Sequence, residues 1–301
     1  MRGVALVTGG AGFIGSHLVE QLISDYDVHV VDNLSRGRRE WVPAEASLHE
    51  ADLLDQDGLT RIVERIRPDL VAHLAAMHFI PAVDSAPQQA REVNVRGSAN
   101  LLRALTSTPP ALALFASSAA VYPDVPGPIS ESTQPLPIDV YGETKLNGEQ
   151  LFADFAAAAG TRCLVARIFN VIGERETNRH VVPELVSQLR AGAAVIKIGN
   201  LTACRDYTDV MDVAWALARL LFEPLEHSTI NVGSGRAVSV RELVHQCEAI
   251  IGRTIRVEVD PDRLRKHDRA ELVADVSRLT AIIGPFPTKP VEQTLAELLA
   301  S

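Results

Sequence analysis

The sequence predicts an α/β fold: a doubly wound parallel sheet with helices on both faces, followed by a smaller C-terminal α/β lobe. Three observations lead to this expectation. Short apolar runs alternate with longer helical patterns through the first 170 residues. These runs are apolar throughout, which is typical of parallel strands buried on both faces. The first run is followed by four closely spaced glycines and then by an amphipathic segment. This pattern is typical of a strand that ends in a turn before a helix begins. Right-handed crossovers between such strands wind the sheet in both directions.

The individual elements follow from the same patterns. Apolar runs predict strands over 4–8, 28–31, 70–74, 111–117 and 163–168, with helices over 13–24, 59–67, 88–106 and 140–159 between them. The rhythm changes after residue 170, where a charged loop over 173–180 precedes helices over 182–191, 210–222 and 239–251 and strands over 194–199, 229–233 and 255–259. We therefore expect a first domain over residues 1–170 and a second lobe over 171–301, some of whose segments return to the main sheet.

Composition excludes several classes of protein. The net charge of −9 argues against a general nucleic-acid binder, which normally carries a basic face. The three cysteines, Cys163, Cys204 and Cys247, are far apart and form no CxxC pair, so neither a disulfide framework nor a metal site is expected. The glycines interrupt the first apolar run too early for a signal peptide, and no run approaches the ~20 apolar residues of a membrane span. We expect a cytoplasmic protein without a membrane partner.

The glycine cluster has a chemical interpretation as well as a conformational one. Gly9, Gly12 and Gly15 form GxxGxxG between a predicted strand and a predicted helix. There, small residues let a pyrophosphate approach the backbone N–H groups at the positive end of the helix, although a tight turn alone would also use glycine. Asp32 ends the second predicted strand, where a carboxylate can accept hydrogen bonds from the adenosine ribose hydroxyls and repel a 2′-phosphate. NAD is therefore expected in preference to NADP, although Arg36, Arg38 and Arg39 lie nearby.

A second group of residues indicates proton transfer. Tyr141 and Lys145 lie four residues apart in a predicted helix, so they share one face. A nearby ammonium is expected to lower the pKa of the tyrosine and make it a usable base and acid. Ser117 and Ser118 end a predicted strand, at the edge of a parallel sheet where ligands bind. The alternative interpretations are a solvated helix face and strand-end caps.

The motifs taken together resemble a known family. "VTGGAGFIGSHL", "VVDNLSRG", "HLAA", "NVRGSANLL", "SSAAVY", "YGETK", "RIFNVIG", "RDYTDVMDVAWAL" and "NVGSGRAVSVREL" extend nearly from end to end. The chain resembles an extended short-chain dehydrogenase/reductase of the nucleotide-sugar epimerase/dehydratase family. The resemblance implies a Rossmann domain that binds NAD(P), a smaller domain that binds a UDP- or GDP-linked sugar, hydride transfer at a sugar carbon, and a homodimer.

The resemblance also implies roles for particular residues. Ser118, Tyr141 and Lys145 correspond to the catalytic residues, and Ser118 also contacts the substrate. Asn94 corresponds to an asparagine that shapes the active site, the alternative being a helix N-cap. Asn170, Arg205 and Arg265 correspond to substrate-binding positions. The cofactor-binding positions implied are Gly9, Gly12, Phe13, Ile14, Gly15, Asp32, Asn33, Asp52, Leu53, Leu74, Ala75, Ala76, Asn94, Tyr141 and Lys145.

The reaction is narrowed by the residues after Ser118. The family's 4,6-dehydratases carry acidic residues there, whereas this chain has Ala119 and Ala120, which cannot transfer protons. We expect an NAD-dependent 4-epimerase that acts through a transient 4-keto sugar. The alternatives are a 4-keto-6-deoxysugar reductase, which the C-terminal part resembles, and a non-catalytic nucleotide-sugar sensor. Unusual loops at 77–84 and 173–180, and Pro123, leave the sugar open.

Overall fold

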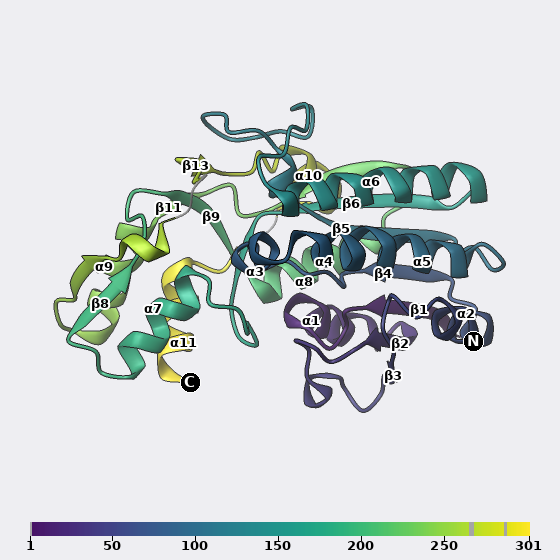
Figure 1. Ribbon diagram of the computed structural model, residues 1–301, viewed down its shortest axis with the longest axis horizontal. Coiled ribbons are helices and arrows are strands. Elements are labelled where there is room, and N and C mark those ends of the chain that lie inside the picture. Colours follow the sequence, from purple (N-terminus) through teal and green to yellow (C-terminus); the bar gives the residue numbers. More distant parts are fainter. Residues whose placement is uncertain (1, 265–267, 286–287) are drawn as a thin grey trace.

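The computed structural model describes residues 2–264, 268–285 and 288–301. Its centre is a seven-stranded sheet in the order β10-β6-β5-β4-β1-β2-β3, in which every neighbouring pair is parallel (Figure 1). The strands are β1 (Gly3–Thr8), β2 (Tyr26–Asp32), β3 (Ser47–Glu50), β4 (Leu70–His73), β5 (Leu112–Ser118), β6 (Arg162–Ile168) and β10 (Ser228–Val232). The predicted doubly wound parallel sheet is confirmed. The sequence analysis missed β3, a short edge strand that begins with Ser47, ends with Glu50 and contains only one apolar residue.

The strands are apolar throughout because helices cover both faces. Alternate residues of a strand point to opposite faces, so Val7 of β1 joins one core while Leu6 joins the other. The first core lies under α1 (Phe13–Leu22), α8 (Val210–Phe222) and α10 (Ser277–Ile283). The second lies under α2 (Gln56–Ile66), α5 (Gly97–Leu105) and α6 (Val140–Ala159). Two separate apolar layers therefore fix the sheet from both sides.

The predicted helix over 88–106 is broken into different segments. It consists of α4 (Pro87–Arg91), a π-helical turn η2 (Glu92–Arg96) and α5, and α3 (Ile80–Ser85) precedes it. Single π-turns inside helices often occur at functional sites because they displace one side chain from the regular repeat. The displaced region here contains Asn94.

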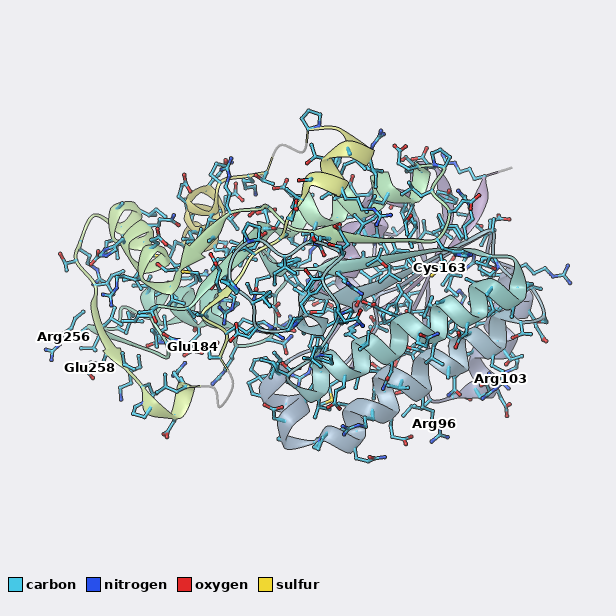
Figure 2. The ribbon with its side chains drawn as sticks, turned by 90° about the horizontal axis from the view of Figure 1, so that it is seen from above. Arg96, Arg103, Cys163, Glu184, Arg256 and Glu258 are labelled. Carbon is cyan, nitrogen blue, oxygen red and sulfur yellow. The ribbon has the colours of Figure 1, made fainter. Side chains whose placement is uncertain are left out.

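The remaining elements form a smaller lobe at one end of the molecule. A four-stranded sheet contains β7 (Asn170–Ile172), β9 (Cys204–Asp209), β11 (Ala237–Ser239) and β13 (Glu271–Leu272), and β8 (Val195–Ile198) pairs with β12 (Arg256–Val259). The helices of the lobe are α7 (Val181–Arg190), α9 (Val240–Ile251) and α11 (Val291–Ala300). In the described parts of both units, the 3₁₀ turns are η1 (Arg39–Trp41), η3 (Ala119–Val121) and η4 (Pro261–Arg263). Figure 2 shows Glu184 and Arg256 in this lobe and Arg103 at the opposite end of the molecule.

The two parts of the chain interleave. β10 pairs with β6 at the edge of the main sheet, and α8 packs against α1, although both elements follow residue 170. A buried carboxylate joins the lobe to this edge: Asp206 of β9 accepts N–H bonds from Ser234 (2.7 Å), Gly235 (2.8 Å) and Ala274 (3.2 Å). The division into domains at residue 170 stays a prediction. Among the described residues, no helix is both long and apolar enough to cross a membrane.

Candidate active site

The glycine-rich turn joins the carboxyl end of β1 to the start of α1. Gly9 has a φ of 73°, and a Cβ there would lie 2.7 Å from the backbone nitrogen of Ala75. A Cβ on Gly15 would overlap the carbonyl oxygen of Gly9, whereas one on Gly12 would meet only that oxygen, at 3.2 Å. The turn is therefore packed on its inner side and open at Gly12.

The start of α1 suits an anionic group. The helix begins at Phe13, its first turn contains no acidic residue, and no described side chain caps it. The first N–H groups of a helix lack partners within the helix and carry the positive end of its dipole. These features fit the pyrophosphate of a dinucleotide, and binding by Phe13 and Ile14 stays a prediction.

Asp32 lies beside this turn at the end of β2. Its carboxylate accepts N–H bonds from Ala11 (3.1 Å) and Leu34 (2.8 Å), and only 9% of the residue is exposed. Burial raises the pKa of Asp32, and the two backbone donors oppose that rise. The carboxylate is therefore fixed in orientation by the glycine-rich turn itself, in the position expected for contact with a ribose.

The other residues predicted near the adenosine also come together. Asn33 donates a hydrogen bond to Asp52 (2.8 Å), and the N–H of Leu54 holds the second oxygen of that carboxylate (2.8 Å). Leu53 packs on Gly97, where a Cβ would lie 2.9 Å from that of Leu53. Asn33 and Asp52 are thus bonded to each other, whereas Leu53 is buried against Gly97; contact of the three with adenine stays a prediction.

Asn94 organises the loop that follows β4. Its side chain accepts from the N–H of Met77 (2.7 Å) and donates to the carbonyl of Met77 (3.0 Å) and to the hydroxyl of Thr144 (3.0 Å). Because Asn94 lies within η2, the alternative interpretation as a helix N-cap is wrong. The residue instead joins the segment after Leu74, Ala75 and Ala76 to the helix that carries Tyr141.

The predicted catalytic residues are adjacent in space. Tyr141 and Lys145 lie in the first two turns of α6, whose N-cap Asp139 accepts the N–H of Gly142 (2.7 Å). Ser118 ends β5, and its hydroxyl is a hydrogen-bond partner of the Tyr141 phenol. The Lys145 Nζ lies 5.9 Å from the centre of the Tyr141 ring and donates to the carbonyl of Ala116 at 2.7 Å.

The electrostatics differ from the expectation in one respect. Burial raises the pKa of Tyr141, and the bond from Ser118 is the contact that lowers it. Lys145 is directed at the Ala116 carbonyl, and burial lowers its own pKa to about 8. Ser118 therefore bonds the phenol directly, and stabilisation of the phenolate by the Lys145 ammonium, 5.9 Å from the ring centre, stays a prediction.

A buried ion pair below the site was not predicted. Glu149, one turn beyond Lys145 on α6, accepts two bonds from Arg167 of β6, from Nε (2.9 Å) and Nη2 (2.7 Å). The hydroxyl of Ser117 donates to the same carboxylate. The charge of Glu149 raises the pKa of Lys145, against the effect of burial. Glu149 thus favours the ammonium form of Lys145.

The predicted substrate residues lie in the lobe or at its junction with the main sheet. Asn170 begins β7, and Arg205 lies in β9, the strand that pairs with β7. The guanidinium of Arg205 is already bonded within the protein, to Asp268 (2.6 Å) and to the carbonyls of Cys204 (2.7 Å) and Arg269 (2.9 Å). Their contacts with a diphosphate stay predictions. Arg265 lies outside the described residues.

Arg269 is a residue that the sequence analysis missed. Its Nη2 donates to the carbonyls of Ala120 (3.2 Å) and Tyr122 (2.7 Å), next to Ser118. It therefore connects the C-terminal part of the chain to the catalytic strand. It lies in the C-terminal part that resembles the reductases, where no single position pointed to this residue.

Fold and site together define a class of dinucleotide-dependent enzyme: a parallel sheet with a glycine-rich phosphate cradle and a Ser–Tyr–Lys group at its carboxyl edge. The comparisons agree. Residues 5–233 match the NAD-dependent epimerase/dehydratase family, so the chain belongs to that family. This confirms the predicted family, the enzyme assignment and NAD as the cofactor.

Individual relatives cover almost the whole chain. A UDP-glucose 4-epimerase from Corynebacterium glutamicum is 34% identical over 97% of this chain and 93% of its own length. The structure of a UDP-glucose 4-epimerase from Thermus thermophilus in complex with NAD has a TM-score of 0.90, with 31% identity over 99% of this chain and 98% of that one. A GDP-6-deoxy-D-mannose reductase from Pseudomonas aeruginosa is 30% identical over 98% of this chain and 95% of its own length.

Proposed function

We propose that this protein is an NAD-dependent 4-epimerase of a UDP-linked sugar. The observation that carries the proposal is the group of Ser118, Tyr141 and Lys145. In the chain, Ser118 is followed by two buried alanines, Ala119 and Ala120, and not by acidic residues. One acid–base residue suffices to exchange the proton of a single hydroxyl, whereas removing water would need a further proton donor and acceptor. The relatives named UDP-glucose 4-epimerase support the choice of UDP.

The chain's own residues account for the proton transfers. Tyr141 takes the proton of the 4-hydroxyl, and Ser118 donates to the phenolate oxygen and orients the sugar oxygen. The glycine-rich turn and Asp32 would hold NAD, which would supply a reversible hydride acceptor for C4. Once the 4-keto sugar presents its other face, Tyr141 gives the proton back to the new 4-hydroxyl. Lys145 keeps a positive charge near the phenol, and Glu149 favours that charge.

The cofactor preference follows from Asp32. A carboxylate held by two backbone N–H groups at the end of β2 can accept both ribose hydroxyls and would repel a 2′-phosphate. Two of the nearby arginines face carboxylates, Arg39 facing Glu50 at 2.6 Å and Arg38 facing Glu40 at 3.6 Å. These contacts favour NAD over NADP.

A reductase of a nucleotide-linked 4-keto sugar is the second candidate, because the Pseudomonas aeruginosa reductase aligns over nearly the whole chain. The same three residues would serve it, with Tyr141 donating a proton to the carbonyl oxygen while external reduced cofactor is consumed. The two candidates therefore differ in whether the cofactor is recycled within each turnover.

One experiment separates them. The cofactor is released from purified protein and identified, and the protein is incubated with UDP-glucose or UDP-galactose without added cofactor. If the protein is an epimerase, each of the two UDP-sugars is converted to the other, with no net change in cofactor absorbance. Activity that appears only with a keto sugar and added reduced cofactor would contradict the proposal.

We also propose a homodimer formed through α6 and the neighbouring α5, which lie alongside each other on one side of the sheet (Figure 1). Light scattering coupled to gel filtration tests this, since a monomer of 32.6 kDa would contradict it. A cytoplasmic location stays a prediction.

A further inference from the structure

Three potential metal ligands converge from two loops that are far apart in the sequence. His78 lies between β4 and α3, whereas Glu176 and His180 lie in the loop between β7 and α7. One ligand atom of each side chain lies within 4.8 Å of the other two. The sequence analysis expected no metal site because it considered only the cysteines. We propose that His78, Glu176 and His180 bind a divalent transition-metal ion of the zinc type.

The spacing of the three side chains suits such an ion after a small closure. Zinc bonds of ~2.0–2.1 Å in tetrahedral geometry place ligand atoms ~3.4 Å apart. The three ligand atoms all lie within 4.8 Å of one another, so no pair has to approach by more than about 1.4 Å. Small rotations of a glutamate and two histidines in loops are enough for that change. Two imidazoles and one carboxylate are also a ligand set that zinc uses with a fourth position open.

His78 is already held in a form that can ligate. A ring N–H of His78 donates to the carbonyl of Ala76, and its Nε2 faces the side-chain amide of Asn178 at 3.0 Å. That amide also donates to Glu176 Oε1 at 3.1 Å, so Asn178 Nδ2 lies between His78 Nε2 and the carboxylate, and a bound ion would take the place of this amide. A ligating histidine usually donates its other ring N–H to a carbonyl or carboxylate, which fixes the tautomer.

The other two ligands are also oriented by their neighbours. Glu176 Oε1 accepts the backbone N–H of Asn178 at 2.7 Å. The ring of His180 lies between those of His78 and Phe79, with centroid separations of 6.0 Å and 5.2 Å. Of the three proposed ligands, Glu176 also lines a cleft of about 650 Å³ next to α7.

The ligand set decides between classes of metal, because the positive charges of Lys145 and Arg36 near His78 oppose every cation alike. The three side chains offer two imidazoles and one carboxylate. Calcium and magnesium prefer sites with several oxygen ligands, so they are poorly served here. Imidazole nitrogens favour zinc, cobalt, nickel and copper, and they provide most of the binding.

The site lies next to the catalytic residues but does not depend on the reaction. Met77, the residue before His78, is held by Asn94, which also bonds Thr144 beside Lys145. The open coordination position would be filled by water or by a substrate oxygen. Metal binding is therefore measurable whether the protein is an epimerase or a reductase.

The test uses the full-length protein after chelation and dialysis. Zn²⁺ is titrated by calorimetry, and Co²⁺ is titrated by its visible absorption, which reports nitrogen ligands and low coordination number. We expect one ion per chain in both titrations. Removing a direct ligand should weaken binding by more than the ~10–100-fold typical of outer-shell partners, so His180→Ala and Glu176→Gln should each abolish the cobalt spectrum.

The matched control removes a different histidine contact. His29 Nδ1 lies 2.8 Å from His49 Nε2 on the main sheet, and His49→Gln breaks that pair without touching the proposed site. Unchanged binding in His49→Gln, with loss in the two ligand variants, supports the proposal. Circular dichroism checks folding, and Glu176→Gln decides the matter if His180→Ala does not fold. Binding of no ion by the wild type, or equal binding by wild type and Glu176→Gln, would overturn it.

Discussion

Replacing Glu149 with glutamine tests the buried ion pair beneath the active site. The substitution keeps the shape of the side chain but leaves the guanidinium of Arg167, which is 6% exposed, without a counter-charge. Glu149 accepts bonds from Nε and Nη2 of Arg167 and from Ser117, and an amide offers only one accepting oxygen. Breaking a buried pair by removing one partner costs about 3–5 kcal/mol.

The matched control is another glutamate on the same helix. Glu143 pairs with Arg91 at 2.7 Å, but the two side chains are 50% and 44% exposed, so Glu143→Gln should cost about 0–1 kcal/mol. The free energy of unfolding of both variants is measured by urea denaturation at pH 7 and followed by circular dichroism. The alkaline limit of activity should also move to lower pH in Glu149→Gln, because Glu149 raises the pKa of Lys145.

Two results would refute this reasoning. Equal losses of stability in Glu149→Gln and Glu143→Gln would show that burial does not strengthen the pair. An unchanged alkaline limit would show that Glu149 does not act on Lys145.

Three other predictions address the cradle, the lobe and the pH dependence of stability. Gly15→Ala should weaken NAD binding at least tenfold in a fluorescence titration, because the added Cβ overlaps the carbonyl oxygen of Gly9 and displaces the turn; unchanged affinity would contradict the cradle. Asp206→Asn should lower the free energy of unfolding by about 1–3 kcal/mol in urea, since one amide oxygen cannot hold three backbone N–H groups; a loss below 0.5 kcal/mol, roughly the size of a typical surface change, would count against it. Burial lowers the pKa of Lys145 to about 8 from 10.5, so between those values the unfolded chain binds more protons and stability should rise with pH; Lys145→Met should remove that rise, and a slope that persists in the variant would assign it to another group.

The sequence predicted the central sheet and the proximity of Ser118, Tyr141 and Lys145 because each has a local signal. A strand such as β5 is apolar at every position, since helices cover both of its faces. Only glycine fits where the backbone closely approaches itself or a phosphate. Tyr141 and Lys145 lie one turn apart in a single helix. These features can be seen in a few neighbouring residues.

The remaining features depend on contacts between distant residues. β9, with the sequence "CRDYTD", is a buried strand whose charges are satisfied by other segments, so its polar composition hid it. Glu149 finds Arg167 on β6, and Arg205 finds Asp268 across the lobe. The π-turn at Asn94 arises where its side chain holds Met77 and Thr144. Composition and periodicity carry no information about such pairings.

The central claim is that Tyr141 exchanges the 4-hydroxyl proton while the hydride on C4 leaves and returns without reaching solvent. The most direct measurement is proton NMR of UDP-galactose incubated with the purified protein in D₂O, without added cofactor. The account predicts conversion to UDP-glucose with hydrogen retained at C4, and a rate reduced ~10²–10⁴-fold in Tyr141→Phe with cofactor still bound. Deuterium at C4, or full activity of the Tyr141→Phe variant, would contradict it.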